Sequence, residues 1–190
     1  MARLGIMAGG LVMLGAALAG CGASVIQGGP LAGEMDPDSH FTQCIDMQRG
    51  DVVVDGFNTI PNKGRQVAVV DKVAFADPVG LRQIAAYVIP DSGELYGDLT
   101  GYPPNGGHQP APPGLDWGAR QNAAGARIPP TPGGGPPKGP NVQLMVVAQS
   151  SGDKASEQGI NVWYHVGGQH YRLRTNVTMI AIVPGTGQTC

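Results

Sequence analysis

The feature that most constrains the fold is a glycine pair, Gly167-Gly168, between two runs of alternating apolar and polar residues. Glycines in this position predict a two-residue β-hairpin turn, because such turns need a positive φ that glycine adopts readily. A two-residue turn also sets the register, so His165 is expected opposite His170. Since side chains alternate along a strand, the turn divides the hairpin into two chemically different faces.

The two faces of this hairpin are predicted to have opposite roles. The side chains expected on the core face are Val162, Tyr164, Val166, Tyr171 and Leu173. The side chains expected on the solvent face, which form a candidate binding surface, are Trp163, His165, His170, Arg172 and Arg174. Any binding chemistry of the hairpin is therefore expected on this second face.

The opposed histidines raise the question of a metal site, because directly paired strand residues have Cβ atoms about 5 Å apart. Two ligands are too few, since zinc sites take three or four protein ligands. No carboxylate lies in the hairpin, and Arg172 and Arg174 would repel a cation. A surface that binds an anion or a glycan is a second interpretation, and an ordinary solvated sheet face is a third. The sequence favours the ordinary face and predicts no metal and no cofactor.

Other apolar or alternating runs, separated by turn residues, predict an all-β chain. The expected strands are residues 51–57, 66–75, 81–89, 94–100, 142–149, 160–166, 169–175 and 177–183, of which 94–100 is the weakest. About seven strands with turns between them are typical of an antiparallel sandwich of immunoglobulin-like type. The Cys-Trp-Cys spacing of true immunoglobulin domains is missing, so this prediction concerns architecture only.

One charged residue interrupts the strand expected at 66–75. Val69, Val73 and Phe75 share a face by alternation, and Asp71 falls on that same apolar face. This position predicts either a β-bulge or a sheet edge at which the carboxylate reaches water.

A long segment rich in proline and glycine, residues 102–140, is predicted to be an insertion in the domain. Loops of this length inside a compact domain are functional or disordered. Trp117 in its middle is expected to pack back on the domain, and the rest is expected to be extended surface chain. The segment is also a candidate for recognition, because an extended Pro-rich chain binds at a low cost in ordering.

The N-terminus has the layout of a secretory signal, with Arg3 followed by an uncharged apolar run over residues 4–18. A transmembrane helix would need roughly 20 apolar residues, and this run is shorter and contains four glycines. The motif that ends it, Leu18-Ala19-Gly20-Cys21, resembles the lipobox of bacterial lipoproteins. The resemblance implies that Cys21 takes a diacylglycerol and becomes the N-terminus, at the extracytoplasmic face of the cell membrane. A secretory signal without lipid is the alternative.

Three further stretches resemble a group of uncharacterised exported actinobacterial β-sandwich proteins. The residues that carry the resemblance lie in Ala68-Val69-Val70-Asp71-Lys72-Val73, in Leu95-Tyr96-Gly97 with Gly101-Tyr102-Pro103-Pro104, and in residues 164–171. The resemblance implies a sandwich fold and an exported location, and it brings no activity or catalytic residue with it.

If Cys21 carries lipid, Cys44 and Cys190 are left as a pair. Such a pair tends to close in the oxidising compartment that an exported chain meets, although two free thiols are the alternative. The predicted organisation is a signal peptide at 1–20, a flexible tether at 21–43 and a β-domain at 44–190. The acidic residues around Asp36 do not fit a calcium-binding loop, so this region is interpreted as solvated linker.

Charge and motifs limit the function. The formal net charge of −2 leaves no basic excess for nucleic acid. The chain lacks the Gly-x-Ser-x-Gly, His-Glu-x-x-His, phosphate-loop and dinucleotide motifs, so no enzyme activity is predicted. The sequence favours a lipid-anchored, non-catalytic module that binds an envelope protein or polymer. The alternatives are a metal-handling lipoprotein that uses His165 and His170 and, least favoured, an envelope hydrolase.

Overall fold

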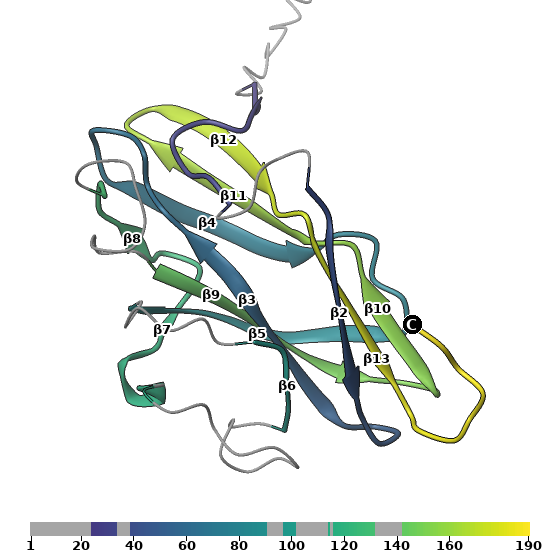
Figure 1. Ribbon diagram of the computed structural model, residues 1–190. Helices are drawn as coiled ribbons and strands as arrows, with labels where there is room; N and C mark the ends of the chain where they lie inside the picture. The colour runs from purple at the N-terminus through teal and green to yellow at the C-terminus, as the bar shows by residue number, and fades with distance from the viewer. Residues whose placement is uncertain (1–23, 34–38, 91–96, 102–113, 115, 132–141) are drawn as a thin grey trace, which may run out of the picture.

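The structure is a computed structural model that describes residues 24–33, 39–90, 97–101, 114, 116–131 and 142–190. Within these ranges every long element is a β-strand, and the one helix is the short 3-10 turn η2 (Trp117–Ala119). The strands form three sheets, an arrangement consistent with a β-sandwich (Figure 1). The prediction of an all-β chain is confirmed.

The first sheet contains the predicted hairpin. Its strands, in spatial order, are β1 (Ile26–Gln27), β12 (Gln169–Arg174), β11 (Ile160–Val166), β4 (Ala68–Phe75) and β8 (Arg127–Ile128). Across the hairpin, Val162 is opposite Leu173 and His165 is opposite His170. The register predicted from the glycine turn is therefore confirmed.

The other two sheets complete the architecture. The second large sheet has the order β6 (Leu99–Thr100), β3 (Val52–Ile60), β9 (Val142–Ser150), β5 (Leu81–Pro90) and β7 (Gln121–Asn122). The small sheet has the order β10 (Lys154–Glu157), β13 (Val177–Ile182) and β2 (Phe41–Asp46). Figure 1 shows the small sheet running along one side of the molecule, with the C-terminus beside it.

The main core draws on all three sheets, and the predicted core face of the hairpin contributes to it. Val162, Tyr164 and Leu173 are buried, and Val166 and Tyr171 pack against the core while staying partly exposed. The Tyr164 hydroxyl donates to the Gly28 carbonyl at 2.8 Å and accepts from the Leu31 amide at 3.1 Å. These bonds satisfy the hydroxyl group of a fully buried tyrosine and hold residues 28–31 against it.

Residues 24–33 and 39–43, the described part of the predicted tether, are not a free linker. Leu31 is buried, and β1 pairs in parallel with β12, so residues 24–33 pack on the first sheet. β2 begins at Phe41 and pairs in parallel with β13. Local sequence did not reveal either pairing, because both join segments far apart in the chain. Residues 34–38, which include the acidic cluster, lie outside the described residues.

One strand, β10, and the middle of the insertion differ from the prediction. β10 lies outside the expected strands, and Ala155 and Glu157 on its inner side are buried. The middle of the Pro/Gly-rich segment supplies β7 and β8, which pair with β5 and β4 in the two large sheets, instead of an extended surface chain. Trp117 packs edge-on against Tyr87 with ring centroids 5.6 Å apart, as predicted. Residues 102–113, 115 and 132–140 of this segment lie outside the described residues.

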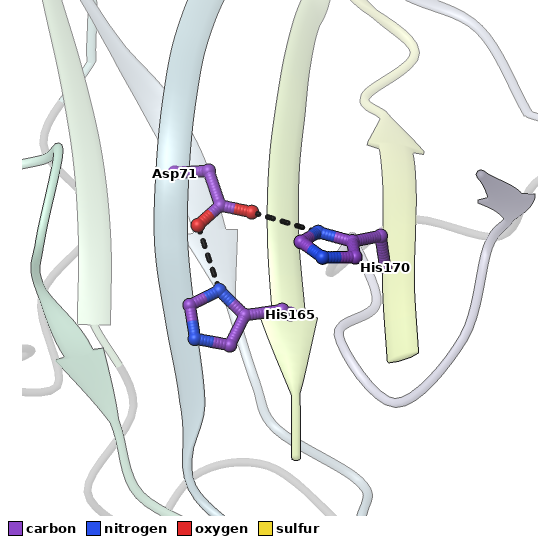
Figure 2. A group of neighbouring side chains, drawn as sticks. All are labelled: Asp71, His165 and His170. Atoms are coloured by element: carbon purple, nitrogen blue, oxygen red, sulfur yellow. Dashed lines mark hydrogen bonds and ion pairs between the residues drawn. The ribbon is translucent and has the colours of Figure 1, made fainter. Parts of the chain in front are cut away.

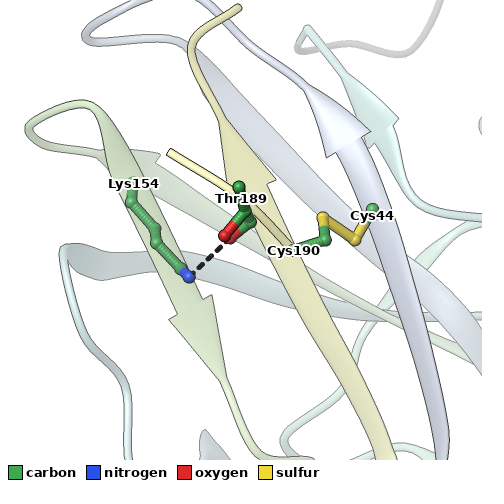
Figure 3. Close-up of a disulfide and its surroundings, with 4 residues drawn as sticks. All are labelled: Cys44, Lys154, Thr189 and Cys190. Atoms are coloured by element: carbon green, nitrogen blue, oxygen red, sulfur yellow. Dashed lines mark hydrogen bonds between the residues drawn. A yellow bond between two sulfur atoms is a disulfide. The ribbon is translucent and has the colours of Figure 1, made fainter. Parts of the chain in front are cut away.

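The predicted disulfide joins Cys44 in β2 to the last residue, Cys190, with Cα atoms 6.2 Å apart (Figure 3). Beside it, Lys154 in β10 donates to the Thr189 carbonyl at 2.8 Å. The bridge spans a sequence separation of 146 residues. In the chain-entropy model a closed loop of this size adds up to about 5 kcal/mol of stability. The disulfide therefore holds the C-terminal segment against the small sheet.

The hairpin turn yields a test with a matched control. Gly167 has a φ of 59°, whereas Gly168 has no positive φ and no atom within 4 Å of an added Cβ. Gly167→Ala is expected to lower the free energy of unfolding by about 1–2 kcal/mol, because L-residues are strained in that region. Gly168→Ala is expected to change it by less than about 0.5 kcal/mol. Urea unfolding of both variants measures this, and equal effects would contradict the assigned turn.

Candidate metal centre

A β-bulge in β4 sets the position of Asp71. Between β4 and β11, Trp163 is opposite Lys72 whereas Tyr164 is opposite Val70, so Asp71 is the extra residue. Both Asp71 and Lys72 are exposed, while Val70 and Val73 on either side are buried. The bulge turns the carboxylate away from the apolar face on which simple alternation would place it. The bulge that the sequence offered as one explanation of Asp71 is confirmed.

The bulge brings Asp71 to the two histidines of the hairpin (Figure 2). The Nδ1 atom of His165 lies 2.7 Å from Asp71 Oδ1, and the Nδ1 atom of His170 lies 3.5 Å from Asp71 Oδ2. The two imidazole rings are tilted at 49° with centroids 5.6 Å apart. The side chains of His165, His170 and Asp71 are 33%, 44% and 36% exposed. Each carboxylate oxygen therefore faces one ring at a surface that solvent reaches.

Asp71 adds a third ligand atom to the two that the hairpin provides. One ligand atom from each of Asp71, His165 and His170 lies within 4.8 Å of the other two. Two imidazoles and one carboxylate form a ligand set used for zinc and other first-row transition metals. The hairpin itself has no carboxylate, as expected, and the carboxylate comes from outside it. Asp71 comes from the neighbouring strand, 94 residues away from His165 in sequence.

The arginines of the same face are engaged elsewhere. Arg172 donates to Asn161 Oδ1 at 2.7 and 3.0 Å, and Arg174 pairs with Asp77 at 2.9 Å. The Asp77 carboxylate compensates the charge of Arg174, which weakens the repulsion of a cation by that residue, whereas the neutral Asn161 amide leaves the charge of Arg172 in place. The five residues predicted for the binding surface do share one face of the hairpin.

A second group on this face is centred on Trp163. The Lys72 ammonium lies 5.0 Å and the Arg172 guanidinium 5.3 Å from the centroid of its ring. Both distances are typical of cation–π interactions. Residues of the predicted binding surface therefore lie in two clusters: the histidines with Asp71 in a histidine–aspartate cluster, and Trp163 and Arg172 with Lys72 in a cationic aromatic cluster.

A cavity of about 400 Å³ lies next to the candidate centre. It is lined by residues of β4, β5 and the described part of the insertion, and Asp71 and Lys72 form part of its wall. Asp71 is thus shared between the histidine–aspartate cluster and a cavity large enough for a small molecule.

Comparison of the chain with protein-family models, curated proteins and solved structures finds no match. None of the helical structure in the described ranges is long and apolar enough to cross a membrane. The predicted lipidation residue, Cys21, and the predicted signal peptide at 1–20 lie outside the described residues. The assignment of a function therefore depends on the chemistry of the described side chains.

Proposed function

We propose that this chain is an exported, lipid-anchored, non-catalytic protein that binds one divalent transition-metal ion through Asp71, His165 and His170. The observation that carries the proposal is the convergence of three ligand atoms, from three adjacent strands, within 4.8 Å. Nitrogen and oxygen ligands of this kind suit zinc, cobalt, nickel and copper.

The spacing of the ligand atoms supports this function. Zinc binds histidine nitrogen and carboxylate oxygen at about 2.0–2.2 Å, so tetrahedral ligand atoms lie about 3.3 Å apart. The distances from Asp71 to His165 and His170, 2.7 and 3.5 Å, lie on either side of this value. The three ligand atoms lie within 4.8 Å of one another, so a bound ion would draw them closer together.

The exposure of the three side chains supports an exchangeable metal site over a structural one. Structural zinc sites are closed by four protein ligands, whereas sites with three keep a position open. The side chains of His165, His170 and Asp71 are 33%, 44% and 36% exposed, so solvent reaches all three. We therefore propose reversible binding and exchange of the metal rather than a structural role.

The lipobox-like motif and the position of β1 support a place close to the membrane. Ile26 in β1 pairs with Tyr171, and it follows Cys21 by only five positions. Five extended residues span at most about 18 Å. Lipidation at Cys21 would therefore hold the first sheet, and with it the metal centre, near the membrane surface.

A second candidate function is the binding of an anionic envelope polymer. The observation that favours it is the arrangement of Lys72 and Arg172 against Trp163. An aromatic ring with flanking cations offers both a stacking surface and a positive charge to such a ligand. This function and metal binding use different side chains, so variants separate them.

Metal titration tests the primary proposal. Addition of zinc or cobalt to the chain at pH 7.5 is expected to shift the NMR resonances of His165 and His170 together, with one ion bound. Asp71→Asn, His165→Ala and His170→Ala are each expected to weaken binding at least about tenfold, a change of 1.4 kcal/mol.

The matched control is His40→Ala, which removes an exposed histidine outside the cluster and is expected to leave the affinity unchanged. If His165 and His170 do not shift below about 1 mM metal, the proposed function is wrong. Loss of polymer binding in Trp163→Ala with metal binding unchanged would instead support the second candidate.

Mass spectrometry of the mature protein tests the anchor. The chain purified from membranes is expected to begin at Cys21 and to carry a diacylglycerol on its thiol. Cys21→Ser is expected to remain uncleaved and to carry no diacylglycerol, because the thiol that takes the lipid is missing. An unmodified mature N-terminus, or cleavage at another position, contradicts the lipid anchor.

A further inference from the structure

A second group of oxygen atoms, inside the domain and separate from the metal centre, lacks the partners that buried polar atoms need. Asp55 in β3 is fully buried and Asp98, just before β6, is 3% exposed. Across the described residues, no lysine or arginine forms a salt bridge with either carboxyl group. Buried carboxylates are ordinarily paired with a cation or bound to a metal.

Strand pairing brings these two carboxyl groups together. Val53 is opposite Thr100 and Val54 is opposite Leu99, and the same antiparallel register places Asp55 opposite Asp98. Directly opposite residues share a face, and residues two apart on a strand share it too. Asp55, Asp98 and Thr100 therefore point to the same side of the sheet. Like charges in such a pair are destabilising unless something lies between them.

Only half of each carboxyl group is satisfied by the protein. Asp55 Oδ1 accepts from Asn58 Nδ2 at 2.7 Å, and Asp98 Oδ1 accepts from the Gly56 amide at 3.2 Å. The Oδ2 atoms of Asp55 and Asp98 and the Thr100 hydroxyl oxygen are buried and have no hydrogen-bond partner. Each unsatisfied buried oxygen costs roughly 1–3 kcal/mol.

A glutamine from the small sheet adds another oxygen on this side. The Oε1 atom of Gln43 in β2 is also buried without a hydrogen-bond partner. Its amide lies beside Gly97, the residue before Asp98, where an added Cβ would stand 3.2 Å from Gln43 Nε2. The unsatisfied groups around Asp98 are therefore oxygens from three strands, with no nitrogen or sulfur ligand among them.

We propose that Asp55 and Asp98, with the side-chain oxygens of Thr100 and Gln43, hold a buried calcium ion. Calcium takes six to eight oxygen ligands and accepts carboxylates, amide carbonyls and hydroxyls in flexible geometry. Magnesium needs a near-ideal octahedron and keeps several waters, which suits a dry interior less well. The absence of nitrogen from this group of described side chains separates it from the histidine-containing centre.

A shared proton is the competing way to join the two carboxyl groups. Desolvation raises the pKa of Asp55 to about 6 and raises the pKa of Asp98 well above its ordinary value. A chain without calcium is then most stable at acidic pH, and it loses that stability as the pH rises through the raised pKa values. Calcium would replace the proton shared by Asp55 and Asp98. The buried carboxyl group of Glu157, whose pKa burial and the charge of Asp55 raise to about 8, would still contribute a fall in stability with rising pH. The response to calcium at one fixed pH therefore distinguishes the two explanations.

Thermal unfolding of the full chain with added calcium chloride or with EDTA tests the proposal. Calcium at 100 times its dissociation constant is expected to raise the melting temperature by several degrees at pH 7.5, because only the folded state presents the paired carboxyl groups. Native mass spectrometry of the unaltered chain is expected to find one calcium per chain. This second measurement does not depend on whether any variant folds.

Asp98→Asn is expected to abolish the calcium response while keeping the fold, because it removes the like charge opposite Asp55. His165→Ala, as the cross-control, is expected to keep the calcium response and to lose zinc binding. Equal melting temperatures in calcium and EDTA at pH 7.5 would overturn the proposal in favour of a shared proton. A calcium response retained in Asp98→Asn would overturn it as well.

Discussion

The candidate metal centre depends on one extra residue in β4. Because Asp71 is not matched by a residue of β11, the strand can bury Val70 and Val73 while the carboxylate between them points outward. A regular strand would place Asp71 on the apolar face, where an unpaired charge costs far more than a local distortion of the ladder. The bulge therefore has one effect on the core and another on the surface. It keeps the valines inside and supplies the histidine pair with a carboxylate.

The parts of this site that a sequence reveals are the local ones. The turn at Gly167 sets a two-residue connection, so the opposition of His165 and His170 follows from residues within a few positions of each other. The sequence shows Asp71 as a charged residue in an alternating apolar strand. It does not show which strand pairs with that one, because Asp71 and His165 are 94 positions apart. β2 and β10 were missed for a related reason. Their mixed composition carries little periodicity, and β2 is held by parallel pairing and by the disulfide.

The N-terminal segment has a different role from the one its composition predicts. Glycine and proline in residues 24–33 are typical of a linker, yet Leu31 is buried and the Tyr164 hydroxyl binds the backbone on both sides of Pro30. Tyr164, a side chain of the core, thus holds residues 24–33 against the first sheet, although their local sequence is typical of a linker. With the proposed lipid on Cys21, the first sheet would lie near the membrane instead of standing away from it on a tether.

The central claim is that Asp71, His165 and His170 bind one metal ion together, and X-ray absorption at the zinc edge of the metal-loaded chain tests it most directly. The account predicts a first shell with two imidazole nitrogens and a carboxylate oxygen at about 2.0–2.2 Å. It also predicts that His170→Ala retains one imidazole. A shell made only of oxygen, or a spectrum that His170→Ala leaves unchanged, would contradict the account.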